Sequence, residues 1–206
     1  KNIKKMTKKL SHRGPDNSGY FLDQKYGLAF GHTRLSIQDL SKAGNQPMNS
    51  HNNLFNIVFN GEIYNHLILR KELEEQKKNI FWKGHSDTET ILSCLEHWGV
   101  SKTLQKLQGM FALGIWDTKN KQLFLSRDII GEKPLYFGWG KNVFFFASEL
   151  KALKEHDFFI NSINKKAIKS LVEYSYIKTP HSIYSNIYKL FPGTFLKADM
   201  NIVKNI

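Results

Sequence analysis

The stretch Leu54–His66 reads LFNIVFNGEIYNH and joins an apolar run to a segment rich in helix formers. An Asn-Gly pair after such a run usually signals a two-residue hairpin turn, after which the residues alternate along a second strand. Residues 65–78, NHLILRKELEEQKK, instead carry leucines four positions apart among strong helix formers. The sequence therefore predicts a strand at 54–59 and a helix at 65–78, with Asn60 and Gly61 at the corner between them.

The rest of the chain mixes helix and strand patterns. Apolar residues at helical spacing predict further helices at 2–11, 87–98, 148–155 and 163–175. Strand patterns lie at 20–23, 27–31, 110–117, 122–127, 135–138 and 143–147, and residues 193–206 alternate in the same way. Consecutive strands joined by short polar turns imply antiparallel pairing, and the interspersed helices then cover the outer faces of the sheets. We therefore expect an α+β layered fold.

Composition excludes several classes of protein. A chain of 206 residues with 41% hydrophobic residues fits one domain with a full core. It has neither an apolar run of membrane-spanning length nor a signal peptide, so a cytoplasmic location without membrane contact is expected. The single cysteine, Cys94, excludes an internal disulfide framework. Its place on the apolar side of a predicted helix favours a core role. The eight histidines show no ligand-like spacing, so we predict no metal site.

The net charge of +12 raises the possibility of nucleic-acid binding, because basic surfaces attract phosphate. The excess comes from lysines scattered over the chain, and no nucleic-acid-binding motif accompanies them. We therefore predict no nucleic-acid partner, and keep this class as the lowest alternative. Among the 30 basic residues only Arg13, Arg34, Arg70 and Arg127 are arginines. The planar guanidinium is suited to geometric recognition of carboxylates, so each arginine is a candidate for a specific role.

Two charged residues have both an ordinary and a functional interpretation. Ser86 and Glu89 have capping-box spacing at the start of a helix, which places Asp87 in its first turn. Asp87 there either complements the helix dipole or awaits a cationic group. Arg34, in the segment GHTRLSIQD, is either a surface cation or a clamp for a carboxylate.

The order of the motifs carries more information than any one of them. The chain contains, in sequence, HRGPD, RLSI, NGEIYN, GHSDTE, LQGMFALGIWD, RDIIGEKPLYFG, FASELKAL and IYSNIYKLFPGTFL. Together they resemble the glutaminase half of glutamine-hydrolysing asparagine synthetases, which are class II glutamine amidotransferases. The resemblance spans His12 to about Leu196. It implies the fold of N-terminal-nucleophile hydrolases, an αββα sandwich of two mainly antiparallel sheets covered by helices.

The same resemblance implies the site residues. In the resembled enzymes the thiol and α-amine of an N-terminal cysteine supply nucleophile and base, and an Asn side-chain amide with the next Gly N–H stabilises the oxyanion. Here these donors would be Asn60 and Gly61. Arg34 would hold the α-carboxylate of glutamine and Asp87 its α-ammonium group. Main-chain groups of Arg34, Leu35, Ser36, Ile37, Gln38 and Glu62 would complete the pocket.

The chain also departs from the resembled family. It has no N-terminal Cys-Gly-Ile and no ATP-using synthetase half, so residues 1–206 are expected to be an amidotransferase domain truncated at both ends and inactive alone. No cofactor is expected in this domain; ATP and Mg would belong to the missing half. Glutamine, the synthetase domain of the same polypeptide and a possible second copy are the expected partners. The acceptor is a carboxylate, with aspartate preferred. A catalytically dead glutamine-binding or regulatory module is the main alternative.

Overall fold

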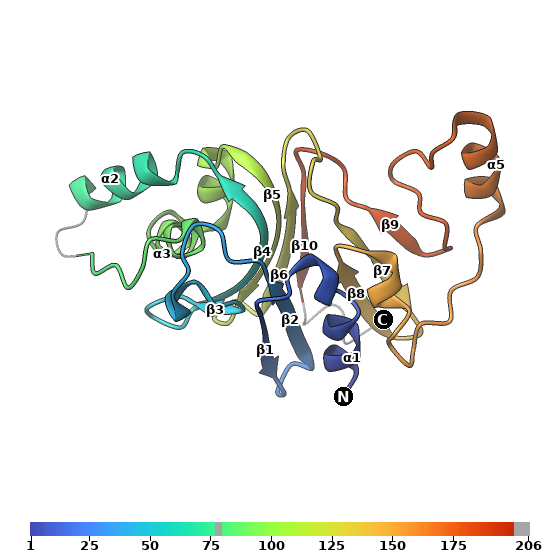
Figure 1. Ribbon diagram of the computed structural model, residues 1–206, viewed down its shortest axis with the longest axis horizontal. Coiled ribbons are helices and arrows are strands. Elements are labelled where there is room, and N and C mark those ends of the chain that lie inside the picture. The colour runs from blue at the N-terminus through green and yellow to red at the C-terminus, as the bar shows by residue number, and fades with distance from the viewer. Residues whose placement is uncertain (77–79, 200–206) are drawn as a thin grey trace.

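The computed structural model describes residues 1–76 and 80–199 (Figure 1). The helices are α1 (Asn2–Lys8), α2 (His66–Gln76), α3 (Asp87–Lys106), α4 (Leu150–Leu153) and α5 (Lys165–Tyr174), with short 3-10 helices η1 (Ser11–Arg13) and η2 (Lys42–Gly44). The strands are β1 (Asn17–Asp23), β2 (Leu28–Arg34), β3 (Met48–Asn49), β4 (Phe55–Ile63), β5 (Gly109–Asp117), β6 (Gln122–Arg127), β7 (Tyr136–Gly140), β8 (Val143–Ala147), β9 (Ile187–Lys189) and β10 (Phe195–Asp199).

The strands pair antiparallel and form three sheets. The largest has the order β10-β6-β5-β4-β3, and the other two are β1-β2 and β8-β7-β9. Alternation along the strands sends successive side chains to opposite faces, so each sheet can contribute to two cores. In Figure 1 the five-stranded sheet stands in the middle, with α2 and α3 on one side and the β8-β7-β9 sheet on the other.

Three apolar clusters separate four layers of structure. The first lies between the five-stranded sheet and helices α2 and α3, and contains Ile57, Phe59, Leu113, Ile115, Leu69, Leu73, Ile91 and Leu95. The second lies between the sheets and contains Phe30, Val58, Ala112, Trp116, Leu125 and Leu135. The third joins α1 and α4 to β8 and contains Met6, Phe145, Ala147, Ala152 and Leu153. The layers therefore run helix, sheet, sheet, helix.

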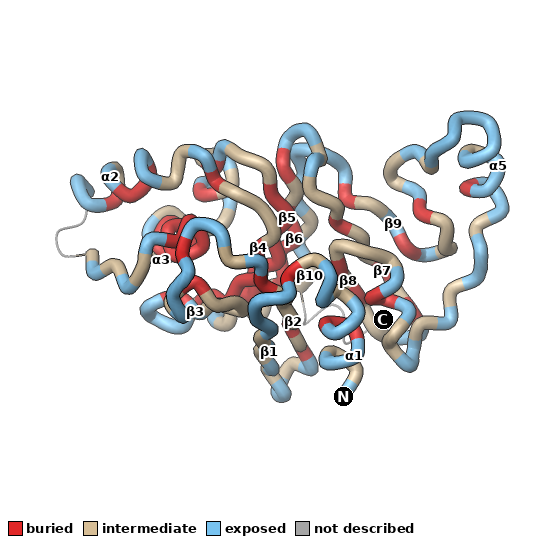
Figure 2. The backbone as a smooth tube through the Cα atoms, viewed as in Figure 1, coloured by how far each residue is buried: buried red, intermediate tan, exposed pale blue. Residues whose placement is uncertain are grey.

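This arrangement confirms the predicted α+β class with antiparallel sheets between helices. The second sheet layer consists of the two smaller sheets. Strand β2 lies at the edge of one and β8 at the edge of the other. The burial pattern agrees with the layering: α3 is largely buried, whereas α5 is mostly exposed (Figure 2).

Several predicted boundaries were wrong. Strand β4 does not end at residue 59 but continues through Asn60 and Gly61 to Ile63. Helix α3 does not stop at residue 98: Gly99 adopts a φ of 75°, and helical structure resumes after this kink. Helix α4 is shorter than the predicted 148–155. The end of the 65–78 helix and residues 200–206 of the last predicted strand lie outside the described residues.

Among the residues that the structure describes, no helix is long and apolar enough to cross a membrane.

Candidate glutamine-binding site

Asn60 and Gly61 lie within β4, where they pair with Ala112 and Phe111 of β5. The chain turns toward α2 only after Ile63. Nδ2 of Asn60 is buried and has no hydrogen-bond partner within the described part of the chain. A buried donor without a partner costs about 1–3 kcal/mol, so this amide is an unsatisfied donor held in place by a rigid strand.

Gly61 is required by its neighbours in the sheet. Its φ is 156°, and a Cβ at this position would lie 2.0 Å from the carbonyl oxygen of Met110 and 2.7 Å from Cα of Phe111. A side chain here would therefore push β4 away from β5. The absence of a side chain at Gly61 therefore allows the backbones of β4 and β5 to lie close together.

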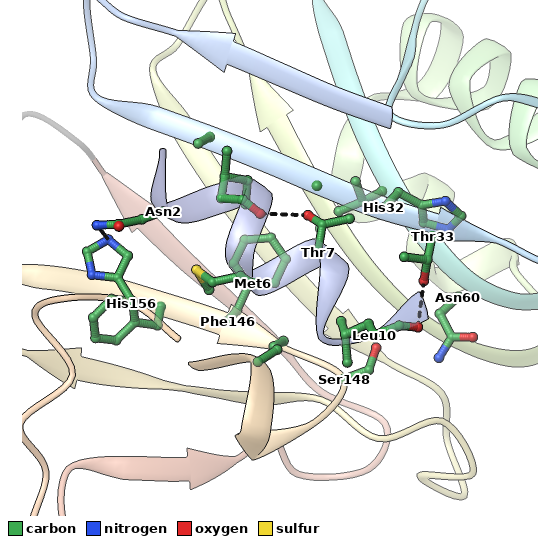
Figure 3. Close-up of a pocket in the computed structure, with 18 of the residues that line it drawn as sticks. Asn2, Met6, Thr7, Leu10, His32, Thr33, Asn60, Phe146, Ser148 and His156 are labelled. Atoms are coloured by element: carbon green, nitrogen blue, oxygen red, sulfur yellow. Dashed lines mark hydrogen bonds between the residues drawn. The ribbon is translucent and has the colours of Figure 1, made fainter. Parts of the chain in front are cut away.

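A cavity of about 500 Å³ lies between β2 and β8. Residues of α1, β2, β4, β5 and β8 line it, among them Thr7, His32, Asn60 and Phe146, together with Ser148, which follows β8 (Figure 3). Asn60 lies at one end, near Leu10 and Ser148, while Asn2 and His156 lie at the other. The cavity therefore runs between the two smaller sheets and reaches the unsatisfied side-chain amide of Asn60.

Asp87 is held in the first turn of α3, as predicted. The Ser86 hydroxyl accepts a hydrogen bond from Glu89 N–H and caps the helix. Asp87 is only 6% exposed, and its Oδ2 accepts a hydrogen bond from Ile63 N–H at 2.9 Å. Burial raises the pKa of Asp87 to about 6, and the negative charge of Glu62 adds to this effect. The hydrogen bonds from the N–H groups of Ile63 and Thr88 act in the opposite direction. Among the described residues no basic side chain forms an ion pair with Asp87, and Arg70 interacts with it only at longer range.

Arg34 ends β2 and is buried. Its Nη1 donates to the Ser41 carbonyl at 2.8 Å and to Asn45 Oδ1 at 2.7 Å, and its Nη2 donates to the Asp39 carbonyl. Within the described chain these bonds use three of the five guanidinium N–H groups. Arg34 is therefore not a surface cation: it organises the loop that follows it, and two of its N–H groups take no part in these bonds.

The other predicted pocket residues lie near these two charges. Gln38 Nε2 donates to Glu62 Oε1 at 3.1 Å, which joins the loop after β2 to the end of β4. Ser36 N–H donates to Asp16 Oδ2 at 2.7 Å. The side chains of Leu35 and Ile37 are exposed. The cavity lining includes Asn60 but neither Arg34 nor Asp87, so the two charged groups lie outside this cavity.

Two residues of the site region were not predicted. Arg70 of α2 is buried and donates to the carbonyls of Gly84 and Ser86, both at 3.0 Å, and to Thr90 Oγ1 at 2.8 Å. Asp39 is buried and accepts a hydrogen bond from His85 N–H at 3.0 Å. The rarity of arginine in this chain was a signal for Arg70, but no local motif surrounds it.

Cys94 is unsuited to nucleophilic chemistry. It is fully buried in the cluster between α3 and the five-stranded sheet. Burial raises the pKa of its thiol to about 12, so the reactive thiolate is not formed near neutral pH. The expected core role of Cys94 is confirmed. Within residues 1–76 and 80–199, no group of three or more His, Cys, Asp or Glu side chains could hold a metal ion.

The layering of antiparallel sheets between helices is the fold expected of a glutamine amidotransferase of the N-terminal-nucleophile type, and the comparison with family models agrees. The chain belongs to the glutamine amidotransferase domain family, whose model matches residues 1–205.

The relatives found by sequence include glutamine-hydrolysing asparagine synthetases. The chain is 38% identical to asparagine synthetase [glutamine-hydrolyzing] 1 of Bacillus subtilis, over 93% of this chain and 29% of that protein. It is 39% identical to putative asparagine synthetase [glutamine-hydrolyzing] 2 of Methanocaldococcus jannaschii, over 91% of this chain and 39% of that protein. The chain thus spans about a third of the length of these relatives.

Solved structures support the same family. Glutamine phosphoribosylpyrophosphate amidotransferase from B. subtilis, complexed with ADP and GMP, is 27% identical, with a TM-score of 0.51 over 61% of this chain and 28% of that one. The allosteric regulatory enzyme of purine biosynthesis has a TM-score of 0.56 over 83% of this chain and 33% of that one, and at 23% identity it supports the fold alone.

Proposed function

We propose that this chain is the glutamine-hydrolysing part of an asparagine synthetase-like amidotransferase, and that it releases ammonia from glutamine for transfer to an acceptor carboxylate. The observation that carries the proposal is the buried, unpartnered Nδ2 of Asn60 at the end of the cavity. A fold that leaves such a donor unsatisfied loses stability, and a ligand oxygen would recover it. The family membership of the chain supports the same reaction.

Each site residue has a role that its chemistry can perform. Asn60 Nδ2 and Gly61 N–H would donate to the oxygen that becomes negatively charged when the glutamine amide is attacked. Arg34 would bind the α-carboxylate with its remaining N–H groups, together with main-chain groups of residues 35–38 and Glu62. Asp87 would bind the α-ammonium group. Such a cation lowers the pKa of a neighbouring carboxyl and offsets the cost of burying the charge.

The nucleophile, in this proposal, is the N-terminal cysteine of an extended segment preceding Lys1. Two observations support it: Cys94 is buried and protonated, and the cavity between β2 and β8 is flanked by two strand edges that an extended segment could pair with. The thiolate would attack the amide carbon, the nitrogen would leave with a proton as ammonia, and water would cleave the thioester to give glutamate.

The proposal also concerns the part of these relatives that the chain does not cover. Their printed names describe glutamine-hydrolysing asparagine synthetases. A further domain would use ATP and Mg to activate the acceptor carboxylate, with aspartate as the preferred acceptor. The cytoplasmic location, the possible dimer and the absence of a nucleic-acid partner remain predictions.

A catalytically dead glutamine-binding module is the second candidate, favoured by the absence of a suitable cysteine within residues 1–206. Both candidates require that the chain bind L-glutamine. Isothermal titration of the 206-residue polypeptide with L-glutamine tests that shared requirement, and saturable binding that Asp87→Ala abolishes is the expected result. Equal heats for L-glutamine and D-glutamine, or no binding at all, would exclude both candidates. Ammonia release separates them in a polypeptide to which a segment with an N-terminal cysteine is added before Lys1.

A further inference from the structure

Asp39 connects the two loops that carry the charged groups of the site. Its Oδ1 accepts a hydrogen bond from Ser41 N–H at 2.8 Å, and its own carbonyl accepts one from the Arg34 guanidinium. Its Oδ2 accepts a hydrogen bond from His85 N–H at 3.0 Å. His85 lies two residues before Asp87. A single buried residue therefore bridges the loop after Arg34 and the loop before Asp87.

The loop before Asp87 is held from its other side by Arg70. The Arg70 guanidinium donates to the carbonyls of Gly84 and Ser86, which flank the His85 N–H that Asp39 accepts. A Cβ on Gly84 would lie 2.4 Å from Asp39 Oδ2, so the carboxylate is in close contact with this backbone. The segment from Gly84 to Ser86 is thus clamped between a carboxylate and a guanidinium.

The carboxylate of Asp39 is suited to a permanent bridging role because it stays ionised. A hydrogen bond from the Ser41 side chain holds the pKa of Asp39 below its ordinary value, although burial opposes this shift. The N–H groups of His85 and Ser41 and the charge of Arg34 lower the pKa further. Hydrogen bonds to an ionised acceptor are about twice as strong as neutral ones. Asp39 therefore resists changes in the spacing of the two loops.

We propose that Asp39 is a positioning residue that sets the separation between the Arg34 guanidinium and the Asp87 carboxylate, and so selects ligands that carry an α-carboxylate and an α-ammonium group together. The inference rests on the proposed function of Arg34 and Asp87. A ligand with both charges gains from the two contacts at once only where their spacing matches its own. A ligand with only one of these charges makes only one of the two contacts, so its affinity does not depend on their separation.

Titration calorimetry with three ligands separates this role from general support of the fold. The ligands are L-glutamine, glutaramic acid, which lacks the α-ammonium group, and 4-aminobutanamide, which lacks the α-carboxylate. We expect Asp39→Asn to raise the Kd for L-glutamine by about tenfold or more, and to change the Kd of either analogue by less than about threefold. The advantage of L-glutamine over both analogues therefore shrinks.

Asp117→Asn is the matched control. Asp117 is also buried and also accepts backbone N–H groups, those of Lys119 and Asn120, but it does so in the turn between β5 and β6. We expect it to lower stability without changing the preference for L-glutamine. Should Asp39→Asn fail to fold, Asp39→Glu keeps the charge, lengthens the side chain by one methylene and should show the same loss of preference.

Three results would overturn the inference. The first is unchanged L-glutamine affinity in folded Asp39→Asn or Asp39→Glu, and the second is an equal loss for all three ligands. The third is failure of the parent chain to bind L-glutamine, which also overturns the proposed function. Binding by the parent with unchanged selectivity in the variants rejects the positioning role of Asp39 alone.

Discussion

The carboxylate of Asp87 accepts a hydrogen bond from Ile63 N–H at 2.9 Å, and this contact ties the first turn of α3 to the strand that contains Asn60. The bond joins two motifs that lie more than twenty residues apart in the sequence. It holds the proposed ammonium-binding group and the proposed oxyanion donor on one rigid unit.

Replacing Asp87 with Asn should give a pH-dependent gain in stability. The pKa of Asp87 rises from 3.8 to about 6 in the folded chain, so the folded state favours the protonated form. Its contribution to stability is fully present below the unfolded pKa and is lost as pH rises through about 6. Because Asn mimics the neutral acid, we expect the variant to match the parent near pH 4 and to exceed it by up to about 3 kcal/mol near pH 8. Urea unfolding across this range measures the difference, and a gap that widens toward acid pH would contradict it.

Asn60→Ala should separate stability from catalysis. The variant removes a buried donor that has no partner, so we expect its unfolding free energy to stay within about 1 kcal/mol of the parent. In the polypeptide that carries the N-terminal cysteine, loss of one oxyanion donor should lower kcat by about 100- to 1000-fold with little change in KM. Equal kcat for variant and parent would contradict the role assigned to Asn60.

Gly61→Ala should disrupt the sheet, because the added Cβ meets the Met110 carbonyl oxygen at 2.0 Å. We expect a loss of about 3 kcal/mol or more in thermal or urea unfolding. Gly27→Ala is the matched control: Gly27 also has a positive φ, of 66°, but a Cβ there meets nothing within 4 Å. Its cost should be limited to about 1–2 kcal/mol of backbone strain. Equal losses in the two variants would show that conformation rather than contact requires Gly61.

Glu149→Gln tests the ionic link between η1 and α4. Against the cost of partial burial, hydrogen bonds from Lys151, Arg13 and His12 hold the pKa of Glu149 at about 2. The stabilisation is present above the unfolded pKa of 4.5 and is lost as pH falls toward about 2. With 24% of the side chain exposed, we expect the variant to lose about 1–2 kcal/mol at neutral pH and less as the medium is acidified.

The control for Glu149 is Glu173→Gln, in the exposed Lys169–Glu173 pair of α5. Such a pair contributes about 0.5 kcal/mol or less, so this variant should resemble the parent at every pH. A loss at Glu149 that is independent of pH would mean that packing, rather than charge, is responsible.

Local patterns predicted most of the elements and missed those that depend on distant contacts. The hairpin of β5 and β6 and the Ser86 cap were predicted because alternation and capping spacing are properties of a few neighbouring residues. Strands β3 and β9 have two and three residues, too few to show alternation. The strand through Asn60 and Gly61 was predicted too short, because the pairing with β5 overrides the turn preference of Asn-Gly.

The sequence suggested candidate site residues but not the contacts that hold them. Asp87 and Arg34 could be named because they lie in short motifs. Arg70 was marked only by the rarity of arginine and Asp39 by nothing, since their roles consist of hydrogen bonds to backbone groups that are distant in the sequence. No local pattern indicated that the loop after Arg34 uses three of the N–H groups of its guanidinium.

The central proposal is that residues 1–206 contain a glutamine site that lacks only its cysteine. The most direct test measures ammonia release from L-glutamine by the chain alone, and by a longer polypeptide in which a segment with an N-terminal cysteine is added before Lys1. We expect release from the longer polypeptide only, and its reduction by about 100-fold or more in Asn60→Ala. Ammonia release by the 206-residue chain alone, or none by the longer polypeptide, would contradict the proposal.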